Sequence, residues 1–301
     1  MNIIAVDWGK DTVKRAAFIA NTTTRVVAKL KFDGTLSDLF NHSRASSEGV
    51  LIGIDAAIGF PYNAWQLMPD NILTSSQNFI EFLFGPNRPE NFFNKVALVS
   101  DWSPTSPFIK PPPGKWSRSA FELVSNNGLR RPIDKKLGGN PMFVTCGIPG
   151  SVGSGTLALW QELIALHAIE PYSIWPFEGQ FEQLIKQKKP VIAEIYPRAC
   201  YGIALSENLP ATLTKIAKTQ KSPRAHAIDS LLTKPWLTEA GITINDLELA
   251  YDNEDDFDAM ISALALLRLH LEHASFESLF ADNEKIEGGI LGSGSLNVLS
   301  S

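Results

Sequence analysis

Cysteine and long apolar runs are the two features that this chain most clearly lacks. Only Cys146 and Cys200 occur in 301 residues, without a Cys-x-x-Cys pair, so a disulfide framework cannot form. No apolar run approaches the roughly 20 residues that a membrane-spanning helix needs. The first residues also lack the basic segment and the small-residue cleavage site of a secretory signal. We therefore expect a cytoplasmic protein that makes no membrane contact.

Positive charge is in deficit as well, with 27 lysine and arginine residues against 32 aspartate and glutamate residues and a net charge of −5. A protein that binds nucleic acid over a broad surface is usually basic. The basic residues are nevertheless distributed unevenly along the sequence, with one cluster within residues 110–136 and another within residues 208–228. Such clusters can form a positive lip beside a negative site, although ordinary solvated surface gives the same pattern. The candidate phosphate contacts in them are Arg131, Lys136, Lys221 and Arg224. Nucleic acid is therefore a candidate partner, while the oligomeric state stays open.

Several common catalytic motifs are also missing. No Gly-x-Ser-x-Gly occurs, which removes the simplest serine-hydrolase interpretation. Gly114-Lys115 lacks the upstream glycine of a phosphate-binding loop. His270 and His273 lie one helical turn apart, but no third zinc ligand accompanies them. The chemistry therefore has to come from other residues.

The composition is 44% hydrophobic and 20% charged, which is typical of a folded α/β protein with a sizeable core. Short apolar runs bounded by turn residues predict strands at 2–7, 13–20, 24–32, 50–55 and 191–196. Apolar residues at helical spacing predict helices at 36–44, 157–167 and 257–273.

These elements predict one fold over residues 1–301. The first three strands are joined by short turns and so should be antiparallel, whereas a helix before the fourth makes it parallel to the first. We expect a mixed five-stranded sheet with helices on both faces. Prolines interrupt residues 61–189, which we interpret as a large irregular elaboration inserted within the single domain.

Acidic residues stand at or near the ends of three apolar runs. Asp7 and Asp55 each close a predicted strand, and Glu194 lies inside another between Ala193 and Ile195. A carboxylate among apolar residues is costly to bury unless its charge is compensated. The last predicted helix opens with further acids, of which Asp255 and Asp258 share one helix face.

Each acid alone has an ordinary explanation, as a turn residue, a cap or a favourable charge at a helix N-terminus. Together they would repel one another unless a cation neutralised them. Hard divalent ions prefer oxygen ligands, so the pattern predicts a Mg²⁺ or Mn²⁺ site. One or two such ions can promote phosphodiester hydrolysis. We predict that the metal ligands are Asp7, Asp55, Glu194, Asp255 and Asp258, and that all of these except Asp255 are catalytic.

The same acids, in the same order, resemble the metal site of the ribonuclease H-like superfamily, which takes acids from the first and fourth strands and from a late helix. Asp255-x-x-Asp258-Ala259 is similar to the helix motif of its Holliday-junction resolvase branch. More narrowly, residues 54–61 (IDAAIGFP), 194–198 (EIYPR) and 255–259 (DDFDA) resemble a family of predicted nucleases known as domain of unknown function 429. The resemblance implies a ribonuclease H-like fold and a metal-dependent nuclease, that is, a hydrolase.

Two other functions stay open at this point. Residues 6–12 (VDWGKDT) also resemble the first phosphate loop of the actin-like and sugar-kinase superfamily, although Asp55-Ala56-Ala57 is a poor second copy of that loop. An ATP-dependent phosphotransferase is therefore one alternative. A non-catalytic binding protein that keeps the acids on the same fold is the other.

Overall fold

The computed structural model describes residues 1–44, 46, 48–146, 151–279 and 282–297. The chain folds into two compact units, which are described separately. The first comprises Met1–Asp55, Pro171–Leu279 and Ile290–Ser301, and the second comprises Ala56–Glu170 and Phe280–Gly289. The segment predicted as an insertion, 61–189, coincides with the second unit over 61–170, while 171–189 belong to the first unit.

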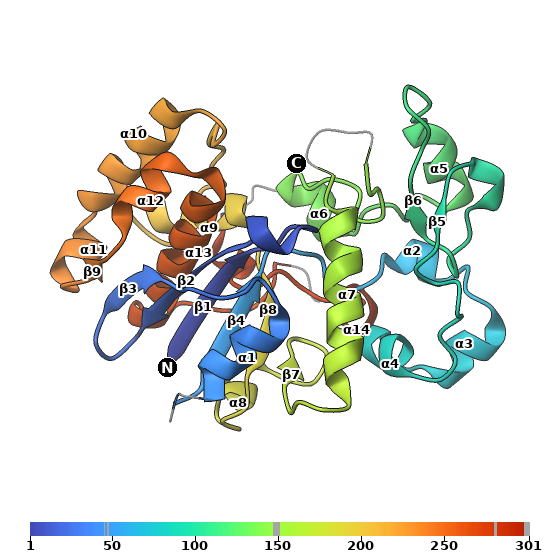
Figure 1. The fold of residues 1–301 in the computed structure, drawn as a ribbon, viewed down its shortest axis with the longest axis horizontal. Coiled ribbons are helices and arrows are strands. Elements are labelled where there is room, and N and C mark those ends of the chain that lie inside the picture. The colour runs from blue at the N-terminus through green and yellow to red at the C-terminus, as the bar shows by residue number, and fades with distance from the viewer. Residues whose placement is uncertain (45, 47, 147–150, 280–281, 298–301) are drawn as a thin grey trace. The chain divides into compact units, whose positions relative to one another are not determined.

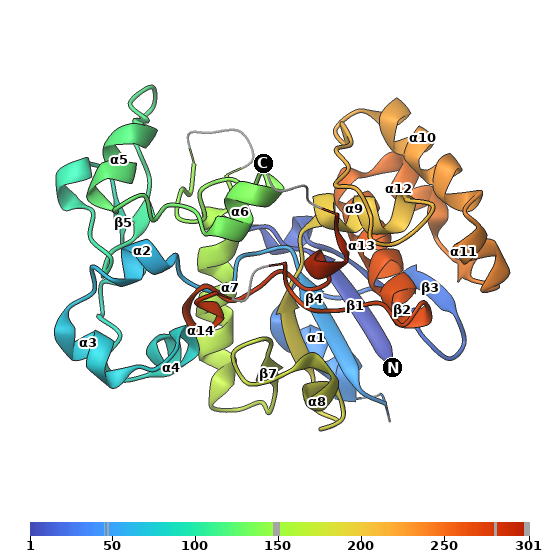
Figure 2. The ribbon, with the colours of Figure 1, turned by 180° about the vertical axis from the view of Figure 1, so that it is seen from behind.

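The first unit carries the main sheet and most of the long helices (Figures 1 and 2). Its strands are β1 (Asn2–Asp7), β2 (Ala16–Asn21), β3 (Val26–Lys29), β4 (Val50–Ile54), β7 (Ser173–Ile174), β8 (Val191–Glu194) and β9 (Thr243–Ile244). Its helices are α1 (Leu36–Arg44), α8 (Phe181–Ile185), α9 (Pro197–Leu205), α10 (Lys221–Leu232), α11 (Pro235–Glu239), α12 (Leu247–Asp252) and α13 (Glu254–Leu271), with 3₁₀ turns at Thr12–Lys14 and Ser293–Ser295.

The sheet is mixed, with strand order β7-β8-β4-β1-β2-β3-β9. Strands β1, β2 and β3 are antiparallel neighbours, and the other four strand pairs are parallel. All five residues of β4 are buried, as a continuous apolar run in a parallel sheet predicts. The sheet has seven strands, so the prediction of five was wrong. The two additions, β7 and β9, are two residues long and leave no periodic pattern in the sequence.

Helix α13 packs against β1, β2 and β3 on one face of the sheet and against α9. Every residue from Phe257 to Leu269 is buried. Its N-terminus is capped by Asn253, whose side-chain oxygen accepts hydrogen bonds from the backbone N–H groups of Asp255 and Asp256. Helix α1 lies on the opposite side of the sheet from α13 (Figures 1 and 2). The sheet is thus covered on both faces.

Close approach to the sheet depends on Gly53 in β4. A Cβ atom there would lie 2.8 Å from Cγ2 of Ile195 and 3.2 Å from Cδ1 of Leu266 in α13. Because glycine has no Cβ, the helix and the chain after β8 can both pack tightly over the central strand.

The second unit is built around aromatic side chains. Its elements are α2 (Tyr62–Trp65), α3 (Asp70–Ser75), α4 (Phe79–Phe84), β5 (Lys95–Val96), β6 (Phe108–Ile109), α5 (Arg118–Val124), α6 (Pro132–Leu137), α7 (Gly153–His167) and α14 (Glu284–Glu287), with a 3₁₀ turn at Val99–Asp101. The fully buried ring of Trp160 in α7 contacts those of Phe79, Phe92 and Phe108, at centroid distances of 4.8 to 6.0 Å. These rings form an apolar core, which could not be recognised in the sequence because prolines interrupt its regular pattern.

None of the described helices combines the length and the apolar character that crossing a bilayer requires.

Candidate functional site

Three of the predicted acids meet at one edge of the main sheet. Strands β1 and β4 are parallel with Val6 opposite Ile54, so the residues that follow, Asp7 and Asp55, leave the sheet at the same end. The backbone N–H of Asp55 donates to the carbonyl of Val6 at 3.0 Å, which continues the ladder to the acid itself. Glu194 ends β8 opposite Ile54 and is also buried. Parallel pairing therefore places these three acidic residues at the same edge of the sheet.

Asp258 joins them from α13. Its side chain is 1% exposed, and both of its carboxylate oxygens are engaged. The hydroxyl of Tyr201 in α9 donates to Oδ1, and the ammonium of Lys218 donates to Oδ2 and forms an ion pair with it. Lys218 lies in the loop between α9 and α10, outside any regular element. Neither Tyr201 nor Lys218 was predicted from the sequence.

Burial and mutual repulsion raise the pKa values of the two strand acids. Burial is the main reason that the pKa of Asp7 lies well above its ordinary value, and the charges of Asp55 and Asp258 raise it further. Burial also raises the pKa of Asp55 to about 7, where the charge of Lys218 opposes the shift and those of Asp258 and Glu194 add to it. Close carboxylates are thus electrostatically coupled across three strands and one helix.

The pKa of Asp258 is raised by burial as well, even though the positive charge of Lys218 and the hydrogen bonds from Lys218 and Tyr201 lower it. Asp255, one turn earlier in α13, raises the pKa values of both Asp258 and Asp7 by its negative charge. All five predicted metal ligands are therefore in the same electrostatic neighbourhood, and one lysine does not compensate their charge.

Lys218 itself remains cationic. Burial lowers its pKa, yet the charges of Asp258, Asp7 and Asp55 together raise it above the ordinary value. Its backbone carbonyl accepts a hydrogen bond from the guanidinium of Arg224, which is 5% exposed. The same guanidinium donates to the carbonyls of Tyr251 and Asp252, at 3.0 and 3.1 Å. Arg224 therefore positions the loop that carries Lys218, whereas the sequence predicted that it contacts phosphate directly.

The other predicted phosphate contacts have different surroundings. Arg131 belongs to the second unit and is wholly buried, with its guanidinium 2.7 Å from a carboxylate oxygen of Asp134 and 2.9 Å from the carbonyl of Glu287. Its role is structural rather than the predicted contact with substrate, because it presents no charge to solvent. Lys136 follows in the same helix, α6, and is half-buried. Lys221 is exposed and pairs with Asp252 at 2.6 Å.

A small pocket of about 180 Å³ opens beside Asp55 and Asp258. The first turn of α9 forms one wall, and bases from that turn and from the following loop also line it. Its remaining lining residues are Tyr196, Pro197, Arg198, Tyr201, Lys215, Ile216 and Lys218. The pocket therefore places cationic groups and a helix N-terminus next to carboxylates, an arrangement that suits an anion held against a cation.

The donor chemistry of the cluster fits a hard divalent ion, since all of its acids offer oxygen ligands. No described residue donates a hydrogen bond to the carboxylate of Asp7 or Asp55, so their charge has no such compensation. Asp258, in contrast, has both oxygens occupied by Tyr201 and Lys218. Within the described part of the chain, no three His, Cys, Asp or Glu side chains are arranged to hold a metal ion. Asp7 and Asp55 are thus the ligands that the structure leaves available.

No family model, curated protein or solved structure matches this chain. The resemblance to ribonuclease H-like nucleases therefore rests on the motif residues themselves.

Proposed function

We propose that the protein is a metal-dependent phosphodiesterase of the ribonuclease H-like type, acting on nucleic acid with Mg²⁺ or Mn²⁺. The observation that carries the proposal is the pair of acids Asp7 and Asp55, whose pKa values are raised by burial and by the charge of Asp258, and to whose carboxylates none of the described residues donates a hydrogen bond. Burying carboxylates next to one another lowers the stability of the fold. Strongly perturbed carboxylates of this kind therefore occur mainly at functional sites. A divalent ion would offset the loss of stability.

Asp7 and Asp55 would hold the ion, with Glu194 beside Asp55 and Asp255 adding negative potential. When bound, the ion supplies Lewis-acid stabilisation of phosphoryl charge and favours ionisation of water. Tyr201 and Lys218 orient Asp258 and neutralise part of its charge. Because Lys218 already contributes one positive charge at this place, we expect the site to take one divalent ion.

The surrounding pocket supports a phosphate-containing substrate. Lys215 and Arg198 line it together with Lys218, so an anionic group entering it meets several positive charges. The strand order also agrees with the fold that the resemblance implies, since β1, β2 and β3 are antiparallel and β4 and β8 follow in parallel.

The phosphotransferase alternative has less support. A pocket of about 180 Å³ is smaller than the roughly 300 to 1,000 Å³ that is typical of small-molecule and cofactor sites. It can admit a single phosphoryl group, as an extended phosphodiester substrate would present.

The proposal is tested by following cleavage of bis(p-nitrophenyl) phosphate and of labelled single-stranded, duplex and branched DNA and RNA, with Mn²⁺ or with chelator. We expect Mn²⁺-dependent cleavage by the wild type and at least a hundred-fold loss in Asp7→Asn. Glu239→Gln is the matched control, because it also removes one carboxylate but from an exposed position at the end of α11. Equal rates in Asp7→Asn and in the control, or no cleavage of any of these substrates, would refute the proposal.

A further inference from the structure

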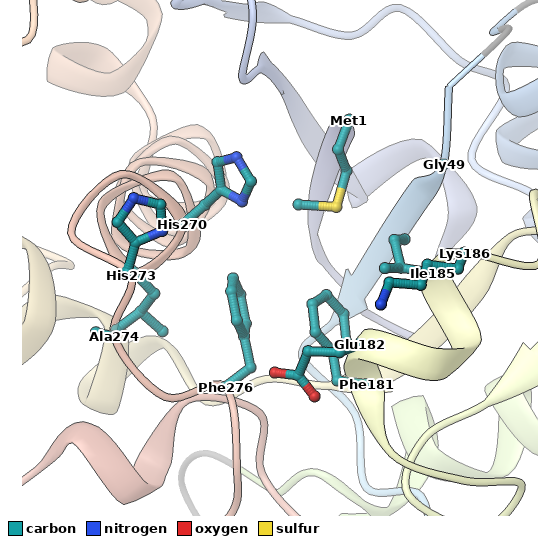
Figure 3. A pocket seen from close by; sticks show the side chains of 11 residues that line it. Met1, Gly49, Phe181, Glu182, Ile185, Lys186, His270, His273, Ala274 and Phe276 are labelled. Carbon is teal, nitrogen blue, oxygen red and sulfur yellow. The ribbon is translucent and has the colours of Figure 1, made fainter.

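A second and larger cavity, of about 470 Å³, lies in the first unit (Figure 3). It is at the opposite end of the sheet from the carboxylates. Met1 and Gly49, which line it, directly precede β1 and β4, whose far ends lead to Asp7 and Asp55. A six-residue strand is about 20 Å long, so the cavity is distinct from the acidic cluster. Its volume falls in the range of about 300 to 1,000 Å³ that small-molecule sites occupy.

The walls of the cavity are mostly apolar and include two stacked rings. Phe181 in α8 and Phe276, which follows α13, have centroids 4.4 Å apart and an interplanar angle of 25°. Both rings are at most 5% exposed, so they are fixed in position rather than mobile in solvent. Leu269 and Ile185 extend the apolar lining. Because the two rings cover each other's faces, only their edges can reach the cavity, and an aromatic edge packs favourably against the face of a flat ring.

Two histidine side chains, those of His270 and His273, border the same space, and neither is hydrogen-bonded to any of the described residues. His270 lies in the last turn of α13 and His273 follows the helix, and both form one side of the cavity in Figure 3, opposite Ile185 and Lys186. Burial lowers the pKa of His270, and the charges of the chain's amino group and of His273 lower it further. A neutral imidazole can donate one hydrogen bond and accept another, so it can pair with a ring that carries both kinds of group.

We propose that this cavity is a binding site for a planar nitrogen heteroaromatic molecule of one or two fused rings, of purine size. The ring would lie against Phe276 and hydrogen-bond to His270 and His273. Lys186 and Glu182 also line the cavity and are exposed, so they would meet the substituents of the ring. The proposal is independent of the phosphodiesterase activity, since it shares no residue with the acidic site.

The site is tested by titrating isotope-labelled protein with adenosine, adenosine monophosphate and ribose 5-phosphate while recording the histidine side-chain resonances. We expect the signals of His270 and His273 to shift in a saturable way with the two purines. The other three histidines, His42, His167 and His226, should not move. Ribose 5-phosphate should have no effect, because it carries no aromatic ring.

Two variants locate the binding. Phe276→Leu keeps an apolar side chain but removes the aromatic edge, and should weaken adenosine binding at least ten-fold. His270→Gln changes only a half-buried side chain, and should weaken it similarly even if Phe276→Leu proves unstable. Asp7→Asn should bind adenosine as the wild type does. The proposal is overturned if neither purine moves both histidine signals, if ribose 5-phosphate moves them equally, or if both cavity variants bind adenosine with wild-type affinity.

Discussion

Substitution of Lys218 is the most direct perturbation of the acidic site, because Lys218 forms the only ion pair that Asp258 makes with a described residue. The change Lys218→Met keeps much of the apolar stem and removes the ammonium group. It leaves Asp258, which is 1% exposed, without its counter-charge beside Asp7 and Asp55. We therefore expect a loss of stability that depends on pH and that a divalent ion reverses.

The magnitude follows from the burial of the two partners. Breaking a fully buried ion pair by removing one partner costs about 3 to 5 kcal/mol, because an uncompensated charge remains. The side chain of Lys218 is 34% exposed, so solvent screens part of the interaction and we expect about 2 to 3 kcal/mol at pH 8. The pKa of Asp258 is already raised, so without Lys218 the carboxyl group takes up a proton readily. At pH 5 the loss should consequently fall below about 1 kcal/mol.

Urea unfolding at pH 5 and pH 8, with and without Mn²⁺, measures these quantities. An ion that replaces the lost charge should bind the variant at least ten-fold more tightly than the wild type, which corresponds to about 1.4 kcal/mol of additional stabilisation. Lys221→Met is the matched control, because its ion pair with Asp252 is exposed on both sides, and it should change little at either pH. The reasoning is refuted if Lys218→Met loses the same stability at both pH values, or if Mn²⁺ stabilises it no more than the wild type.

Two further substitutions distinguish effects on the acidic site from effects on the stability of the fold. The folded-state pKa of Asp55, about 7, lies above its unfolded value, so its contribution to stability is greatest below about pH 4 and is lost as the pH rises through 7. Asp55→Asn should accordingly be more stable than the wild type at pH 8, by up to about 4 kcal/mol, because each of the roughly three units by which the pKa is raised corresponds to about 1.4 kcal/mol. The difference should shrink toward pH 4, and Mn²⁺ binding should be lost. Lower stability of the variant at pH 8 would contradict this. Arg131→Met removes a buried partner of Asp134 and should lower the unfolding free energy by about 3 to 5 kcal/mol, seen in thermal or urea melts. Its Mn²⁺ affinity should be unchanged at a temperature where it is folded, and a selective loss of affinity would instead assign Arg131 to the site.

Much of the sheet could be predicted because burial on both faces leaves an unmistakable apolar run. Residues 2–7 form a strand as predicted, and the predicted strand 50–55 forms over 50–54. Their parallel pairing follows from the intervening helix. Once that pairing is known, Asp7 and Asp55 must emerge at the same edge. Glu194 joins them because β8 is the next parallel neighbour of β4.

The partners of Asp258 could not be predicted in the same way. Lys218 lies 40 positions before it in an irregular loop, and no local pattern links the two. The acid-free stretch within residues 208–228 was the only available signal. The predictions for Arg131 and Arg224 were also based on charge alone, and both residues are buried. A buried arginine that donates to backbone carbonyls cannot be distinguished in sequence from an exposed arginine that binds phosphate.

The most direct test of the central claim is anomalous diffraction from a crystal soaked in Mn²⁺ at pH 8. We expect a single anomalous peak within coordination distance of Asp7 and Asp55, with Lys218 still beside Asp258, and no peak in crystals of Asp55→Asn. Absence of density between those two carboxylates at saturating Mn²⁺, or a peak that persists there in Asp55→Asn, would contradict the metal site on which the proposed function depends.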